Sequence, residues 1–263
     1  MAFLYGWLVE REWLDETEFV VESPEWRGRD VRLAVLADLH TRTQDGEYID
    51  RIVQRTLEMK PDAVLLLGDF MAGSPQSTLE TSMGETEIAE HLKPLTNLPC
   101  YAVLGNHEYL YDAAAARVAL ENAGVKFVEG QRVRLLIDGL PLDIGGIHNV
   151  SRDHGLGQVP EPQLGVPLVL LSHSPSGAKH AHPGTLVTLA GHMHGGQFRI
   201  PGVGPVFHFD MCVPRAHTAG AFTLPSGQLV YVSRGLGTGS VPIRICCRPE
   251  LLTLVVRQAK QTD

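Results

Sequence analysis

Cysteine is scarce in this sequence, and positive charge is outnumbered by negative charge. The four cysteines, Cys100, Cys212, Cys246 and Cys247, form no CxxC pair among the 263 residues, which argues against a disulfide framework or a cysteine-rich zinc module. We therefore expect reduced thiols and a cytoplasmic protein. Lysine and arginine total 22 against 30 aspartates and glutamates, a formal net charge of −8. That balance argues against nucleic acid as the partner, because such binding needs a basic face.

Long apolar runs are also missing. No stretch reaches the roughly 20 residues of a membrane-spanning helix, and the start MAFLYGWLVERE lacks the basic region and cleavage site of a signal peptide. All three tryptophans nevertheless lie in the first 26 residues, so residues 1–28 read as an aromatic-rich N-terminal extension. We expect this extension to pack on the domain or to self-associate. Peripheral membrane contact is the alternative, against which its acidic neighbours argue, and no oligomeric state is implied.

Five nearly unbroken apolar runs predict strands that are buried on both faces. They are residues 31–37, 63–67, 100–104, 168–171 and 186–190. Apolar residues at helical spacing predict three intervening helices. These helices cover residues 49–57, 88–95 and 112–122, and Asp112 is the N-cap of the third while Gly124 ends it.

Shorter candidate strands occupy the rest of the chain. Residues 125–128, 132–137 and 142–147 follow one another closely, with a turn at Asp138-Gly139, and are predicted to be partly antiparallel neighbours. A second sheet layer is predicted from residues 220–224, 228–232 and 251–256. No linker or repeat divides the chain. We therefore predict a single α/β domain over residues 1–263, with two packed sheets flanked by helices.

Each of the five buried runs ends in a motif with metal-binding side chains. The motifs are Asp38-Leu39-His40, Gly68-Asp69, Gly105-Asn106-His107-Glu108, His173 and Gly191-His192-Met193-His194. Sites in open α/β sheets form at the carboxyl ends of strands, so we expect these side chains to share one crevice. Metal ions would compensate the buried carboxylates and imidazoles. Nitrogen and oxygen donors without thiolate favour Mn, Fe or Zn, and seven donors favour two ions.

The order of these motifs resembles that of the calcineurin-like metallophosphoesterases. Residues 195–201, 233–238, 242–244 and 248–250 further resemble the bacterial branch of YkuE-type phosphoesterases and UDP-2,3-diacylglucosamine hydrolases. The resemblance implies a four-layer α/β/β/α sandwich, two mixed sheets flanked by helices, that holds two divalent or trivalent ions, first of all Mn²⁺. One departure is Ala72, where the family often has aspartate or asparagine. The implied ligands are Asp38, His40 and His194 for one ion, Asn106, His173 and His192 for the other, and Asp69 as the bridge.

Two further residues are predicted to be catalytic. The resemblance implies attack on phosphorus by a metal-activated hydroxide. His107 is expected to help the leaving group with a proton or a hydrogen bond, and Glu108 to orient His107. The substrate is a small-molecule phosphodiester or pyrophosphate, with a lipid-linked sugar nucleotide as the leading candidate. The alternatives are a nucleotide or small-molecule phosphodiesterase or phosphatase, and a metal-binding scaffold without turnover.

Residues outside the motifs leave several alternatives open. The apolar loop 207–213 either covers an acyl chain or base, or is ordinary packing. Residues 195–197 either give the metals room or hold the substrate. An extended backbone over 191–194 would direct His192 and His194 to one side and Met193 to the other. Candidate phosphate ligands are Arg199, Arg215, Arg234 and Arg244.

Overall fold

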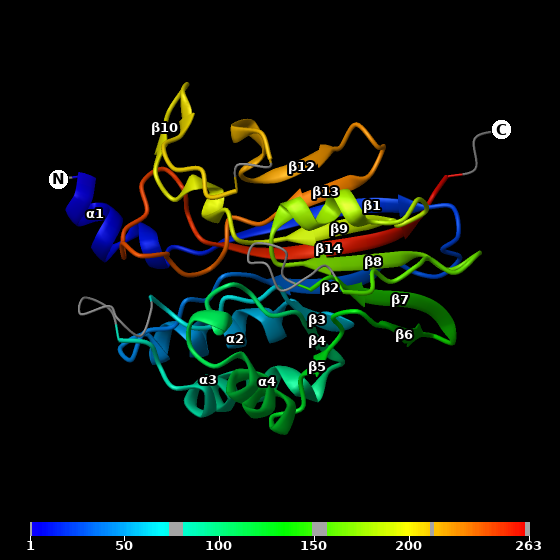
Figure 1. Ribbon diagram of the computed structural model, residues 1–263, viewed down its shortest axis with the longest axis horizontal. Coiled ribbons are helices and arrows are strands. Elements are labelled where there is room, and N and C mark those ends of the chain that lie inside the picture. Colours follow the sequence, from blue (N-terminus) through cyan, green and yellow to red (C-terminus); the bar gives the residue numbers. More distant parts are fainter. Residues whose placement is uncertain (1, 74–80, 149–156, 211–212, 261–263) are drawn as a thin grey trace.

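Two six-stranded mixed sheets pack face to face in the computed structural model, which describes residues 2–73, 81–148, 157–210 and 213–260 (Figure 1). The first sheet has the order β1 (Asp15–Ser23), β14 (Glu250–Gln258), β2 (Val31–Leu36), β3 (Ala63–Leu66), β4 (Cys100–Ala102) and β5 (Lys126–Phe127). The second has the order β12 (Gly220–Thr223), β13 (Leu229–Val232), β9 (Val187–Ala190), β8 (Leu168–Ser172), β7 (Leu140–Gly146) and β6 (Arg132–Ile137).

The first sheet is built on parallel strands β2, β3, β4 and β5, and β14 lies antiparallel beside β2. The prediction that residues 251–256 belong to a second sheet is therefore wrong. Leu252 and Leu254 of β14 face the core between the sheets, while Leu251 faces the helical side. A strand buried on both faces has the same apolar sequence in either sheet, so its sequence does not say which sheet it joins.

The second sheet combines a parallel centre, β7, β8, β9 and β13, with antiparallel β6 and β12 at its edges. Asp138 and Gly139, with φ of 51° and 82°, form the predicted two-residue turn between β6 and β7, where positive φ suits the twist of a hairpin. The expectation that residues 125–128 neighbour these strands is wrong. Residues 126–127 form β5 and pair with β4 of the first sheet, because the chain crosses between the sheets after this point.

Helices α2 (Gly46–Glu58), α3 (Glu85–Leu92) and α4 (Ala113–Asn122) cover the outer face of the first sheet, as Figure 1 shows. Asp112 caps α4 by accepting hydrogen bonds from the backbone amides of Ala114 and Ala115. On the outer face of the second sheet, the 3₁₀ helix η4 (Pro175–His180) packs against β8, β9 and β13. The predicted architecture of two mixed sheets flanked by helices is confirmed, and no α-helix covers that second face among the described residues.

The segment 1–28 contributes directly to the fold. It contains helix α1 (Ala2–Leu8), the 3₁₀ helix η1 (Glu10–Glu12) and edge strand β1, which pairs in parallel with β14. Trp26 is buried in the core between the sheets, whereas Trp7 and Trp13 are exposed. None of the described helices is long and apolar enough to span a membrane.

The packing of α2 on the first sheet allows a prediction about the free energy of unfolding. Ile52 is fully buried there, so Ile52→Ala removes apolar contacts and leaves a cavity, at a cost of about 2–5 kcal/mol in the free energy of unfolding. Val118→Ala on exposed α4 is the control and should change it by less than about 0.5 kcal/mol. Urea denaturation measures both, and equal stability of the two variants would contradict this packing.

Candidate metal centre

The five sequence motifs meet at one place, where strands of both sheets end. Asp38, Asp69 and Asn106 follow β2, β3 and β4 of the first sheet, and His173 and His192 follow β8 and β9 of the second. The expected crevice is formed by the ends of two packed sheets. The core between the sheets therefore sets the distance between the two halves of the site.

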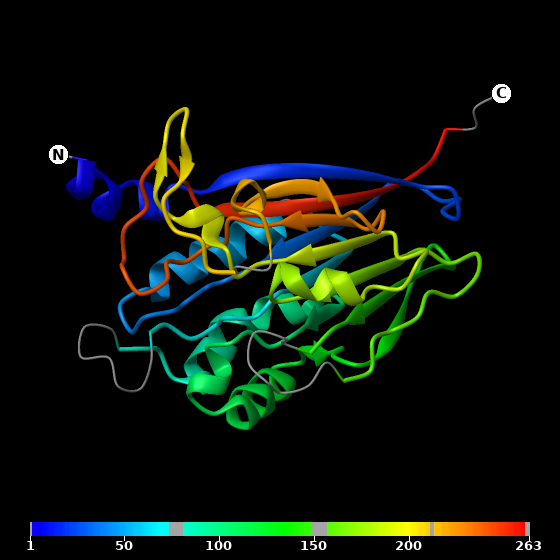
Figure 2. The same ribbon diagram turned by 45° about the horizontal axis from the view of Figure 1, so that its top comes forward.

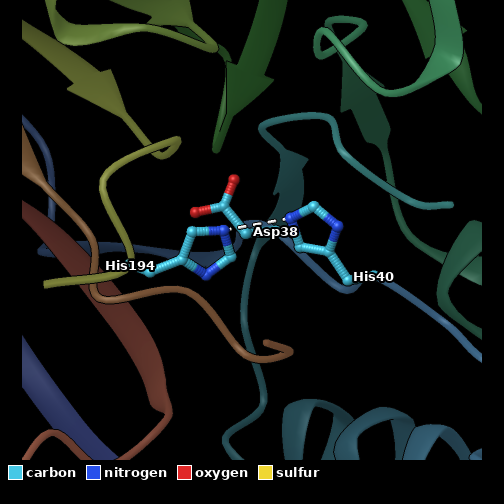
Figure 3. A group of neighbouring side chains, drawn as sticks. All are labelled: Asp38, His40 and His194. Carbon is cyan, nitrogen blue, oxygen red and sulfur yellow. Dashed lines mark hydrogen bonds between the residues drawn. The ribbon is translucent and has the colours of Figure 1, made fainter. Parts of the chain in front are cut away.

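The first group of donors consists of Asp38, His40 and His194, whose ligand atoms lie within 4.8 Å of one another. Figure 3 shows the three side chains directed toward one another. Nε2 of His40 lies 3.0 Å from Nε2 of His194, and the Nδ1 proton of His40 is donated to the Met71 carbonyl at 3.1 Å. The His40 Nε2 lone pair therefore faces the group. Asp38 Oδ2 is buried and has no hydrogen-bond partner.

The second group consists of Asp69, His173 and His192, again with ligand atoms within 4.8 Å. Nδ1 of His173 donates to the Leu67 carbonyl at 2.9 Å. Its Nε2 lies 3.0 Å from Asn106 Oδ1 and 3.1 Å from His192 Nδ1. Asp69 Oδ2 lies 3.3 Å from this Nε2 and 3.4 Å from Nε2 of His40. One carboxylate oxygen of Asp69 therefore stands between the two groups.

Burial and mutual charge shape the ionisation of these groups. Burial raises the pKa of Asp38 to about 7. Burial would lower the pKa of His173, but the carboxylates of Asp69 and Asp38 raise it to about 9. Burial, with His173 opposite, lowers the pKa of His192 to about 4. Burial likewise holds the pKa of His194 well below its usual value, so this imidazole is neutral.

These donors fit a pair of cations. A buried carboxylate oxygen without a partner and imidazole nitrogens only 3.0–3.1 Å apart would be costly if they faced only one another. A cation placed among these lone pairs would remove that cost. Carboxylate and neutral imidazole are the forms in which these side chains bind transition metals. The set contains carboxylate, imidazole and one amide oxygen, and no thiolate.

The backbone at these ligands is strained. Asp38, His40, Asp69, His192 and His194 all have positive φ, between 42° and 70°, which costs a residue with a side chain about 1–3 kcal/mol. Strain of this kind is kept only where the surrounding structure holds it, and it concentrates at functional sites. Five of the nine non-glycine residues with positive φ in the described chain are predicted metal ligands.

The strain also corrects the expected conformation of residues 191–194. The backbone is not extended, because Met193 is helical (φ −85°, ψ −16°) between the left-handed His192 and His194. Met193 still points away from the site and packs with Val230 and Val232 on the outer face of the second sheet. The two imidazoles therefore share the crevice through alternating helical and left-handed backbone conformations.

The glycines after His194 have a packing role. A Cβ atom on Gly195 would lie 2.7 Å from Cys247 Sγ, and one on Gly196 would lie 2.3 Å from Pro205 Cβ. Gln197 donates its side-chain amide to the carbonyls of Val241 and Ile243. The Gln197 amide group is thus held by the protein itself. Residues 195–197 hold the loop that carries His194 in place through these contacts.

Glu108 is a structural carboxylate. Its two oxygens accept hydrogen bonds from four backbone amides, at 2.7 Å from Gly105, 2.8 Å from Phe70, 3.0 Å from Asp69 and 3.3 Å from Met71. Glu108 was expected to orient His107, but its carboxylate contacts these backbone amides instead. The Glu108 carboxylate links the turn after β3 to the turn after β4. The Asn-His-Glu motif alone does not show which groups this carboxylate contacts.

His107 lies beside His40 and Asp69, with the ligand atoms of the three residues within 4.8 Å of one another. Its backbone amide donates to Asp69 Oδ1 at 2.9 Å, and its ring stands edge-on to His40, with ring centroids 4.4 Å apart at 87°. Nδ1 of His107 is buried without a hydrogen-bond partner. This nitrogen therefore has capacity for a hydrogen bond to a ligand beside the Asp69 carboxylate.

The candidate phosphate-binding arginines are held by the protein itself. Arg244 is fully buried and donates to the carbonyls of Arg234, Gly235, Gly237 and Cys247, which excludes it as a phosphate ligand. The other three also donate to carbonyl oxygens. The pairs are Arg199 with Gly195, Arg215 with Val206, and Arg234 with Arg248.

An aromatic pocket opens beside the first donor group. The Phe209 ring lies 6.0 Å from the His194 ring and 6.1 Å from the Phe207 ring, centroid to centroid. The two phenylalanines belong to the apolar loop singled out in the sequence, of which residues 211–212 lie outside the described part. The pocket has a volume of about 150 Å³, and its lining is Gln197, Phe198, Phe207, Phe209, Ser240 and Val241.

The chain belongs to the calcineurin-like phosphoesterase family, whose sequence profile matches residues 31–197. Phosphodiesterase YaeI of Escherichia coli is 27% identical over 233 residues, covering 85% of this chain and 81% of that protein. YkuE of Bacillus subtilis, an uncharacterized metallophosphoesterase, is 25% identical over 218 residues, covering 80% of this chain and 73% of its own. The resemblance drawn from the five motifs is thereby confirmed.

Two longer proteins extend the comparison. A transmembrane protein with metallophosphoesterase domain from Danio rerio is 28% identical over 262 residues, which are 93% of this chain but only 57% of that protein. The solved structure of Haemophilus influenzae NAD nucleotidase superposes with a TM-score of 0.51 at 16% identity, covering 79% of this chain and 45% of that one. This second likeness shows a common fold.

The hydrogen bonds of Glu108 generate a prediction that separates its two roles. Glu108→Gln replaces an acceptor oxygen by an amide donor that faces backbone N–H groups, so we expect a loss of about 2 kcal/mol or more in the free energy of unfolding. Metal content should fall with it, because the turns that carry Asp69 and Asn106 lose their tie. Thermal unfolding and metal analysis measure both. A variant with full stability and metal content but without turnover would restore the catalytic role.

Proposed function

We propose that the protein is a dinuclear metal-dependent hydrolase of phosphodiester or pyrophosphate bonds. The position of Asp69 Oδ2 supports this proposal most strongly. This oxygen lies 3.4 Å from Nε2 of His40 in one donor group and 3.3 Å from Nε2 of His173 in the other. A carboxylate in this position would bridge two ions held by the two groups. Asp38, His40 and His194 would hold the first ion, and Asn106, His173 and His192 the second.

Two such ions supply a hydroxide nucleophile near neutral pH and positive charge for the phosphate oxygens. The chain's own residues set the geometry. The carbonyls of Met71 and Leu67 fix Nδ1–H on His40 and His173, so both rings present Nε2 to the site. The nitrogen and oxygen donors support Mn²⁺ as the native metal, with Fe or Zn as alternatives.

His107 is our candidate for the general acid. It lies beside His40 and Asp69 with buried Nδ1 unpartnered, and its backbone is held by Asp69. A ring in this position can protonate or hydrogen-bond the oxygen that leaves phosphorus. Glu108 enters only as a positioning residue, through the backbone of Asp69 and Gly105.

A lipid-linked sugar nucleotide is the substrate that we propose first. The pocket of about 150 Å³ next to His194 is lined by Phe198, Phe207, Phe209 and Val241, which suits an apolar group attached near the phosphate. A nucleotide or small-molecule phosphodiester is the alternative. A panel of UDP-2,3-diacylglucosamine, cyclic nucleotides and phosphomonoesters separates them.

The free thiols Cys100, Cys246 and Cys247 support a cytoplasmic setting.

Metal dependence is the first test of this function. Removal of metal by a chelator should abolish hydrolysis of bis(p-nitrophenyl) phosphate, and added Mn²⁺ should restore it, because the proposed nucleophile is a metal-activated hydroxide. The assay records nitrophenolate release together with metal content. A protein that binds metal yet hydrolyses nothing with any divalent ion would be a scaffold.

The role of His107 predicts a split between metal binding and turnover. His107→Ala should keep the bound metal and lose roughly 10²–10⁴-fold in kcat, the usual contribution of a general acid. His40→Ala is the matched comparison and should lose metal as well as activity. Metal analysis and steady-state kinetics measure both variants. Loss of metal from His107→Ala would make His107 a ligand instead.

A further inference from the structure

Helix α1 is apolar on every side and almost uncovered. Phe3 is 66% exposed and Leu8 59% exposed, and Leu4, Tyr5 and Trp7 are exposed as well. The helix has no acidic residue in its first turn and no basic residue in its last. A helix that is hydrophobic all round is normally buried. Its present surroundings therefore leave most of its apolar surface without a partner.

A second apolar projection lies beside α1. The hairpin of β10 (Arg199–Ile200) and β11 (Gly204–Pro205) carries Val203 at its tip, 79% exposed, with Ile200 also exposed. The chain then continues through exposed Phe207 and Phe209, which line the pocket beside His194. The apolar surface thus runs from the hairpin tip to the edge of the candidate metal centre.

One short segment joins the two projections. Arg244 donates its backbone amide to the Gly6 carbonyl of α1 at 3.2 Å, and Arg199 of β10 donates to the Ile245 carbonyl at 2.9 Å. Gly6 permits this close approach, because a Cβ atom there would lie 2.4 Å from the Arg244 carbonyl oxygen. Figures 1 and 2 place α1 and the hairpin at the same end of the molecule. We call α1 together with residues 200–209 the apolar end.

Charge distinguishes the apolar end from the rest of this acidic protein. Residues 2–9 and 200–209 contain no Asp, Glu, Lys or Arg, although charged residues make up 20% of the chain. The acids that directly follow these segments, Glu10 and Asp210, are buried and accept hydrogen bonds from Cys247 N and Ser174 Oγ. Arg215, by contrast, is exposed. The apolar end itself therefore presents no acidic group to a lipid surface, and the partly exposed Glu12 that follows α1 is paired with Arg11 and Arg51.

We propose that the apolar end docks onto the surface of a lipid bilayer, with α1 and the hairpin tip in the interfacial layer. Trp7 and Tyr5 are the side chains that favour this layer, and two separate projections suit a deformable surface better than the matched face of a protein. The docking places the aromatic pocket and the metal centre against the bilayer. Delivery of a lipid-linked substrate by this route rests on the proposed function, whereas the docking itself does not.

Vesicle flotation tests the docking without any turnover. The metal-loaded protein should float with phosphatidylcholine vesicles, and inclusion of phosphatidylglycerol should not strengthen the binding, because residues 2–9 and 200–209 contain no Lys or Arg. Tryptophan emission should shift to the blue, because Trp7 leaves water, whereas Trp26 is buried throughout and Trp13 lies outside the apolar end. The triple variant Phe3→Ser, Trp7→Ser, Val203→Ser should bind vesicles roughly tenfold less tightly or weaker, from the apolar area it no longer buries.

A matched control uses apolar side chains exposed elsewhere. Val118 on α4 and Leu136 on β6 are 54% and 62% exposed, and the double variant Val118→Ser, Leu136→Ser should float like the unmodified protein. Circular dichroism and metal content establish that both variants are folded.

Three results would overturn the docking. They are absence of flotation with either kind of vesicle, equal loss in both variants, and a dimer that the triple variant alone converts to monomer without any vesicle binding. The last would assign the apolar end to a second copy of the chain. Hydrolysis of bis(p-nitrophenyl) phosphate is measured separately, so protein that floats without hydrolysis contradicts only the proposed function, and hydrolysis without flotation contradicts only the docking.

Discussion

The carboxylate of Asp69 is the contact on which the rest of the site depends. It is delivered by β3 of the first sheet, and it lies within 3.4 Å of an imidazole from that sheet, His40, and within 3.3 Å of one from the second sheet, His173. That meeting exists only because the two sheets pack on a common core. The interior of the sandwich therefore sets the spacing of the donors, and the loops set their direction.

Holding polar loops in a buried place requires polar side chains that never reach the substrate. Glu108 gathers four amides from the turns after β3 and β4. The Arg244 guanidinium donates hydrogen bonds to four backbone carbonyls, including that of Gly235. Gly235 in turn lies so near Asp38 that a Cβ atom there would come 2.8 Å from Asp38 Oδ2. These two charges offset the cost of buried, strained backbone.

Much of this could be predicted from the sequence, for a definite reason. Apolar runs mark strands, and donors at their ends mark a site, because both depend on local pattern. The sheet that β14 joins depends on long-range pairing, which an apolar run does not encode. Positive φ at His192 and the four amides on Glu108 depend on tertiary contacts as well. A motif can name a residue such as Glu108 and still leave open which groups its side chain meets.

The molecule thus places a buried candidate metal centre beside an uncovered apolar surface. The central claim is that Asp69 stands between two ions. Anomalous diffraction from crystals grown with Mn²⁺ tests it most directly. We predict two separate anomalous peaks on either side of the Asp69 carboxylate, one near His40 and His194 and the other near His173 and His192. A single peak, or none at this place, would contradict it.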